Sequence, residues 1–174
     1  MIHLFAGGNS VKDIEFGGLG GLKVFINWAF RHFDKEIDVL IWGDDFVGNG
    51  VREHYKEKPK FKLVCYKRSE GLAKDWVDET FEYQRFSFTL LWAVLWLREK
   101  YPKEKIIIHG LDKGDGKDYY DGWNKGMAFH PTPSEIERVS TIERCYKQLD
   151  ELTDRDNIFV AKGSAYKGFT EYDN

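Results

Sequence analysis

The chain alternates short apolar runs with longer segments of helical periodicity. The apolar runs are rich in β-branched and aromatic residues and are bounded by glycine, proline or charged residues, a pattern typical of strands covered on both faces of a sheet. The run at 60–66 begins with polar and apolar residues in alternation, which favours a position near a sheet edge. We expect strands at residues 2–6, 23–28, 37–42, 60–66, 105–112 and 157–161.

Helices are expected between these strands. Residues 86–97 are apolar on nearly every side, which predicts a buried helix. Residues 132–135 read Thr-Pro-Ser-Glu, a capping box with proline in the first helical position, and predict a helix that ends near Leu152. Residues 46–56 favour a weak helix or a loop, and the charged segment 67–82 is expected to be a surface excursion. Strands that alternate with helices predict an α/β fold, here a Rossmann-like three-layer domain with a mostly parallel sheet over residues 1–174.

The first strand ends in a glycine-rich turn, Gly7-Gly8-Asn9-Ser10. Backbone N–H groups can approach an anion closely where no Cβ intervenes, and ligands of α/β proteins bind at the carboxyl ends of the strands. Neither a G-x-G-x-x-G motif nor a P-loop motif occurs in the chain. The turn therefore predicts a phosphate or nucleotide site without identifying a dinucleotide or P-loop class.

Composition and charge limit the classes of partner and compartment that the sequence is compatible with. The formal net charge is −3 and no run of Lys or Arg exceeds two residues, which argues against general nucleic-acid binding because phosphate neutralisation supplies most of that affinity. Cys65 and Cys145 form no C-x-x-C motif and no signal peptide is evident, so we expect a cytoplasmic protein with two buried thiols. The run at 86–97 is shorter than the roughly 20 residues of a membrane span. The sequence leaves the oligomeric state open.

Short blocks at 6–14, 25–28, 84–87, 110–112 and 161–164, with Tyr120, follow one another in a recognisable order. In this order they resemble the compact bacterial sialyltransferases, which use CMP-sialic acid, and the related fold group of 6-hydroxymethylpterin pyrophosphokinases. The resemblance implies a nucleotide or nucleotide-sugar donor, an acceptor that the sequence does not identify, and no required cofactor. It implies that the turn Gly7, Gly8, Asn9 and Ser10 holds the donor phosphate, together with Asn27, Ser87 and Asp112 at the donor, and Tyr120 at the leaving phosphate.

The chain departs from the family at two catalytic positions. Gly114 stands where the family has its first phosphate-binding tyrosine, and no histidine has the spacing of the family's catalytic one. His130 lies somewhat further upstream and is the candidate general base, because a histidine titrates near neutral pH. His109 lies in an apolar strand and is interpreted as structural.

Two other functions stay open. Asp112, Asp115, Asp118 and Asp121 recur at every third position, and carboxylates of this density could hold Mg²⁺ for pyrophosphoryl transfer or form a solvated loop. A nucleotide-binding module without catalysis is the third hypothesis.

Overall fold

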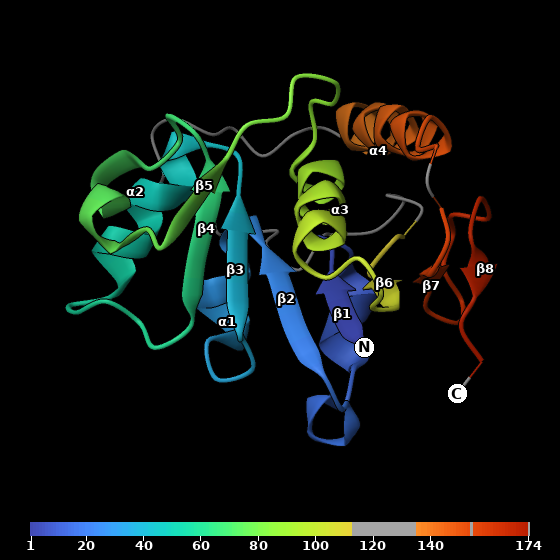
Figure 1. Ribbon diagram of the computed structural model, residues 1–174, viewed down its shortest axis with the longest axis horizontal. Helices are drawn as coiled ribbons and strands as arrows, with labels where there is room; N and C mark the ends of the chain where they lie inside the picture. The colour runs from blue at the N-terminus through green and yellow to red at the C-terminus, as the bar shows by residue number, and fades with distance from the viewer. Residues whose placement is uncertain (113–134, 154, 174) are drawn as a thin grey trace.

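The structure is a computed structural model that describes residues 1–112, 135–153 and 155–173, apart from the side chains of Asn9 and residues 135–138. Its strands form one parallel sheet in the order β5-β4-β3-β2-β1-β6-β7-β8 (Figure 1). The strands are β1 (Ile2–Phe5), β2 (Leu22–Ile26), β3 (Val39–Trp42), β4 (Lys62–Tyr66), β5 (Glu79–Phe81), β6 (Ile106–His109), β7 (Ile158–Val160) and β8 (Thr170–Glu171). The predicted α/β, Rossmann-like fold is confirmed, and all the pairings between these strands are parallel.

Helices cover both faces of the sheet. The α-helices are α1 (Phe30–Phe33), α2 (Asp45–His54), α3 (Thr89–Lys100) and α4 (Glu135–Asp150), and the 3₁₀ helices are η1 (Asn9–Asp13), η2 (Phe16–Gly18), η3 (Asn27–Ala29) and η4 (Gly71–Trp76). Within the described ranges, no helix has both the length and the apolar character to cross a bilayer.

The alternation of side chains along each strand divides the core into two clusters. In β1, Ile2 and Leu4 pack with α3 on one face, whereas Phe5 packs on the other face with the side of the molecule that includes α1 and α2. The helix α3 is buried at most positions, as its apolar sequence predicts. The central strands are thus covered on both sides, which explains their nearly continuous apolar sequences.

Three short elements differ from the sequence-based expectation. The segment 67–82 is more than a surface excursion, because it contains η4 and the edge strand β5. The strand β8 and the one-turn helix α1 also have no clear signal in the sequence. Elements this short are fixed by tertiary pairing, which overrides local propensity.

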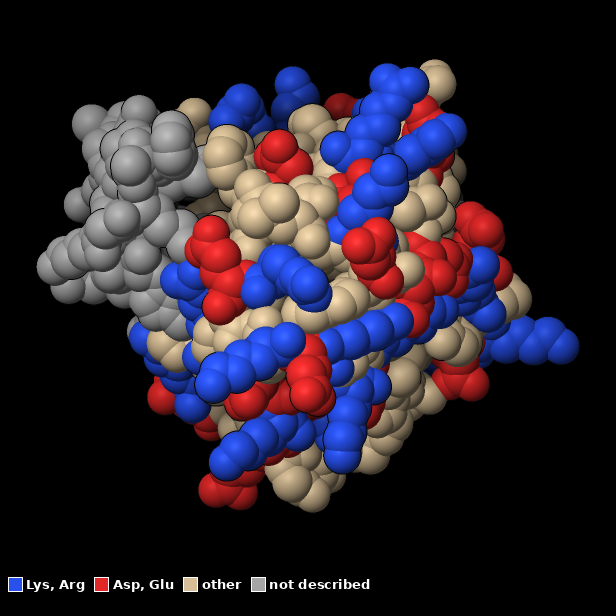
Figure 2. Space-filling view, turned by 90° about the vertical axis from the view of Figure 1, so that its left-hand side faces the viewer, with Lys and Arg blue, Asp and Glu red and all other residues tan. Residues whose placement is uncertain are grey.

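Charged side chains mark the β5 edge of the sheet. Lys62 and Lys100 form ion pairs with Glu79, at 2.8 and 2.7 Å, and these contacts lower the pKa of Glu79 to about 2 against the opposing effect of burial. Figure 2 views the side of the molecule that carries α2 and β5, and shows Lys and Arg interleaved with Asp and Glu. An edge strand with charges of both signs resists pairing with another sheet, and the mixture gives no uniform basic surface for a nucleic acid.

Two buried histidines join β1 to β6. His3 Nδ1 lies 2.9 Å from His109 Nε2, and His3 Nε2 lies 3.1 Å from the carbonyl oxygen of Gly20. Burial lowers the pKa of both side chains, that of His109 to about 4, and the neighbouring His3 adds to the effect at His109. Both histidines are therefore neutral in the folded protein at pH 7.

This pair predicts a loss of stability in mild acid. In the unfolded chain His109 titrates near 6.5, so between this pH and about 4 the unfolded state binds more protons. Stability is full above pH 6.5 and falls as the pH falls through this window, by about 2 kcal/mol between pH 7 and pH 5. Urea unfolding at several pH values measures the effect, and His109→Leu should flatten the slope. An equal slope in parent and variant would contradict the assignment.

Candidate functional site

The strand order places a topological switch point in the middle of the sheet. From β1 the chain proceeds outward through β2, β3, β4 and β5, and it then returns to the other side of β1 to form β6. Connections that leave neighbouring strands in opposite directions open a crevice at their carboxyl ends, where ligands of open α/β sheets bind.

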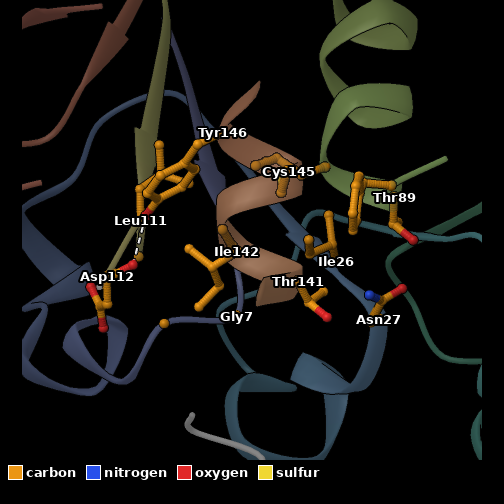
Figure 3. Close-up of a pocket in the computed structure, with 15 residues that line it drawn as sticks. Gly7, Ile26, Asn27, Thr89, Leu111, Asp112, Thr141, Ile142, Cys145 and Tyr146 are labelled. Carbon is orange, nitrogen blue, oxygen red and sulfur yellow. Dashed lines mark hydrogen bonds between the residues drawn. The ribbon is translucent and has the colours of Figure 1, made fainter. Parts of the chain in front are cut away.

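A pocket of about 170 Å³ lies at this switch point, between the ends of β1, β2 and β6 and the helices α3 and α4. In Figure 3, Asp112 lies at one end of the pocket, Asn27 and Thr89 lie at the other, and the α4 side chains Thr141 and Ile142 lie between them. The described residues that line it are Ala6, Gly7, Gly8, Ile26, Asn27, Phe88, Thr89, Leu90, Gly110, Leu111, Asp112, Thr141, Ile142, Cys145 and Tyr146.

The loop after β1 touches the loop after β6 directly. The Gly8 N–H donates to the Gly110 carbonyl at 3.0 Å. A Cβ on Gly8 would lie 2.3 Å from that carbonyl oxygen and 2.6 Å from Cγ of Asp112. Gly110 has a φ of +73°, and a Cβ there would lie 2.6 Å from Cγ2 of Val11. Gly8 is therefore required because protein atoms lie where its Cβ would be. The sequence had suggested instead that this space admits a phosphate.

Asp112 occupies the donors of the first turn. The Ser10 hydroxyl donates to Oδ1 of Asp112 at 2.6 Å and the Ser10 N–H donates to Oδ2 at 2.9 Å. A carboxylate thus accepts the two Ser10 donors that the sequence assigned to a phosphate. An anion at Ser10 would have to displace Asp112 or lie beside a negative charge.

The helix α4 covers the pocket and forms hydrogen bonds with the segments on both sides of it, one after β6 and one before α3. Tyr146 Oη donates to the Asp112 carbonyl at 2.6 Å. Gln148 binds Ser87, donating from Nε2 to the hydroxyl at 3.0 Å and accepting from the Ser87 N–H at 3.2 Å. Ser87 thus connects α4 to the segment before α3, and it is not among the residues that line the pocket.

Asn27 has two features that indicate a ligand contact. It follows β2 directly with a φ of +53°, the left-handed region that asparagine adopts at a cost. Its Oδ1 is buried and has no hydrogen-bond partner among the described residues. Orphaned buried polar atoms are rare in folded proteins, so a ligand donor in the pocket would satisfy this group.

The two ends of the pocket differ in electrostatic character. Thr89 and Leu90 lie in the first turn of α3, where backbone N–H groups and the helix dipole favour negative charge, whereas Asp112 is negative. None of the described lining residues is Lys or Arg. The thiol of Cys145 lies between the two ends, and burial raises its pKa to about 12, so it does not act as a thiolate nucleophile. Cys65 is buried, Cys145 is half-buried, and neither forms a disulfide.

The predicted site residues divide into three groups. Gly7, Gly8, Asn27 and Asp112 line the pocket at the ends of β1, β2 and β6. Ser10 and Ser87 bind protein groups beside it. Tyr120, His130, Asp115, Asp118 and Asp121 lie outside the described residues, as do Gly114 and the side chain of Asn9.

Sequence reasoning missed the contribution of α4. Thr141, Ile142, Cys145 and Tyr146 follow the i, i+1, i+4, i+5 spacing of one helix face, which indicates an apolar face but not what lies beneath it. Within the described part of the chain, no cluster of three His, Cys, Asp or Glu side chains could hold a metal ion.

The contact between the two loops makes a prediction about Gly8. Gly8→Ala should lower the free energy of unfolding by about 1–3 kcal/mol, because the added methyl overlaps the Gly110 carbonyl and Asp112. Gly17→Ala is the matched control, since nothing lies within 4 Å of a Cβ built there. Chemical denaturation measures both variants, and equal stability of the two would show that the junction is not tightly packed.

Comparison of the chain with protein-family models, with curated proteins and with solved structures finds no match, so the site itself carries the functional argument.

Proposed function

We propose that the pocket beneath α4 binds a nucleotide and that the protein is a nucleotide-sugar-dependent glycosyltransferase similar to the sialyltransferases. The observation that carries the proposal is the position of the pocket at the switch point between β1 and β6. Its apolar wall suits a base or sugar ring, and Asn27 offers a hydrogen-bond acceptor to the ligand. The order of sequence blocks supports the choice of donor class.

The electrostatic difference between the two ends favours one orientation of the nucleotide. A phosphate is better placed at the first turn of α3, near Thr89, than at Ser10, whose two donors bind Asp112. Hydroxyl groups of the ligand suit the Asp112 end, because each carboxylate oxygen keeps a lone pair beyond its bond to Ser10. This orientation differs from the one that the glycine turn alone suggests.

The chemical step then falls to residues outside the described part of the chain. Transfer of a sugar breaks the bond between its anomeric carbon and the phosphate oxygen, while an acceptor hydroxyl loses a proton. In the proposal, Tyr120 donates to the departing phosphate and His130 takes the proton. A positioned base contributes roughly 10²–10⁴-fold to rate.

A pyrophosphokinase is the second candidate, supported by the Asp112 carboxylate at the pocket and by the lack of Lys and Arg among the described lining residues. Mg²⁺ supplies positive charge to phosphates in such reactions. The described residues do not fit a metal site by themselves, because Asp112 is a single carboxylate and binds Ser10 through both oxygens. A non-catalytic nucleotide-binding module is the third candidate.

Ligand-induced stabilisation tests the binding step. We expect CMP or another nucleotide to raise the melting temperature, and Ile142→Trp to abolish the shift by filling the pocket. Glu143→Trp is the matched control, because the exposed Glu143 is next to Ile142 on the helix and does not line the pocket. UMP, GMP and ATP, each with and without Mg²⁺, identify the base and the metal dependence. Equal shifts in both tryptophan variants would contradict binding in this pocket.

Release of CMP from CMP-sialic acid tests the reaction. The parent protein should release CMP without Mg²⁺ in the presence of a suitable sugar acceptor, and His130→Ala should reduce the rate by roughly 10²–10⁴-fold while nucleotide binding persists. Turnover that requires Mg²⁺ and ATP would favour the pyrophosphokinase. Nucleotide binding without turnover of either kind would favour the module.

A further inference from the structure

A second pocket lies on the sheet face opposite Leu4 and Ile108. It has a volume of about 270 Å³, and its floor is formed by the histidine pair of β1 and β6 together with Ile107. Because side chains alternate along a strand, this floor is separated by the sheet from the core that α3 covers. The described lining residues are His3, Leu19, Ile107, His109, Ala161, Lys162, Tyr172 and Asp173.

The hydrogen bonds of the pair fix the proton on each ring. The Gly20 carbonyl can only accept, so His3 carries its proton on Nε2 and its Nδ1 is an acceptor. His109 must then donate from Nε2 to His3 Nδ1. In neutral His109 the remaining ring nitrogen, Nδ1, has a lone pair and no proton.

This nitrogen is an acceptor without a partner among the described residues. His109 is only 9% exposed and lines the pocket. Donation from its Nε2 also increases the electron density on Nδ1, since hydrogen bonds in a chain polarise one another. Because His109 lines the pocket, the geometry suits a ligand that brings a donor to this floor.

The rim of the pocket carries one charge of each sign. Lys162 follows β7 and Asp173 follows β8, and both are exposed. The charge of Lys162 also acts on Glu171 in β8, where it helps to lower the pKa of that carboxyl. Leu19 and Tyr172 add an apolar wall. A pocket of this size with a polar floor and an apolar wall suits a small metabolite.

We propose that this pocket is a second ligand site, which binds a free α-amino acid with an apolar side chain. The ligand ammonium donates to His109 Nδ1 and pairs with Asp173, and the ligand carboxylate pairs with Lys162. The side chain lies against Leu19 and Tyr172. A zwitterion fits best because its two charges match the one positive and the one negative side chain at the rim.

Isothermal titration calorimetry with L-leucine, L-phenylalanine and glycine tests the site in the full chain. We expect L-leucine or L-phenylalanine to bind with a Kd of about 1 mM or tighter, and glycine to bind more weakly because it lacks the apolar contact. N-acetyl-leucine, without the ammonium, and leucinol, without the carboxylate, should each bind at least about tenfold more weakly, which corresponds to 1.4 kcal/mol.

Charge-neutral variants locate the binding. Lys162→Gln and Asp173→Asn should each weaken L-leucine binding at least about tenfold, whereas Lys35→Gln, a change at another exposed lysine, should leave it unchanged. Affinity should be constant between pH 8 and 6 and should fall towards pH 4, where the protonated His109 no longer accepts. The proposal would be overturned if neither L-leucine nor L-phenylalanine bound. It would also be overturned if the Lys162 and Asp173 variants bound L-leucine as tightly as the parent does, or if CMP competed with L-leucine.

Discussion

The contact between the turn after β1 and the turn after β6 is the constraint on which the site depends. The Gly8 N–H bonds the Gly110 carbonyl, and both positions exclude a side chain because protein atoms lie where a Cβ would be. This approach brings Asp112 to Ser10 and fixes one end of the pocket. The adjacent strands, β1 and β6, are also the ones that the histidine pair joins further along the sheet.

The opposite wall depends on α4, which is connected to both sides of the crevice. Tyr146 bonds the backbone after β6, and Gln148 bonds Ser87 before α3. The side chains between these attachments determine the depth and the apolar character of the pocket. A change in the tilt of α4 would therefore alter the pocket and both of its anchors together, so this wall and the crevice act as one structural unit.

The layered fold could be predicted because its central strands are apolar on both faces and because the helices α3 and α4 have clear signals in the sequence. The strands at 37–42 and 105–112 and the buried helix after residue 86 are confirmed within a few residues. The short strands β5 and β8 could not be predicted, since a strand of two or three residues is defined by its neighbour and not by its own sequence.

The candidate site was predictable to a lesser degree. The position of Asn27 and Asp112 at strand ends follows from the rule for parallel sheets, and both line the pocket. The partners of Ser10 and Ser87 lie 102 and 61 residues away in the chain. No local pattern reveals that such a hydroxyl is already bound, so sequence alone favoured a phosphate at the first turn.

The backbone conformation of Asn27 lowers the stability of the fold at a position that lines the pocket. A non-glycine residue in the left-handed region is less stable by roughly 1 kcal/mol or more, and glycine would adopt the observed φ of +53° freely. Selection for thermal robustness alone would thus place glycine after β2. In the proposed nucleotide site, the asparagine at this corner would give up stability for a ligand contact, and directed evolution towards heat resistance should favour glycine here at the expense of that contact.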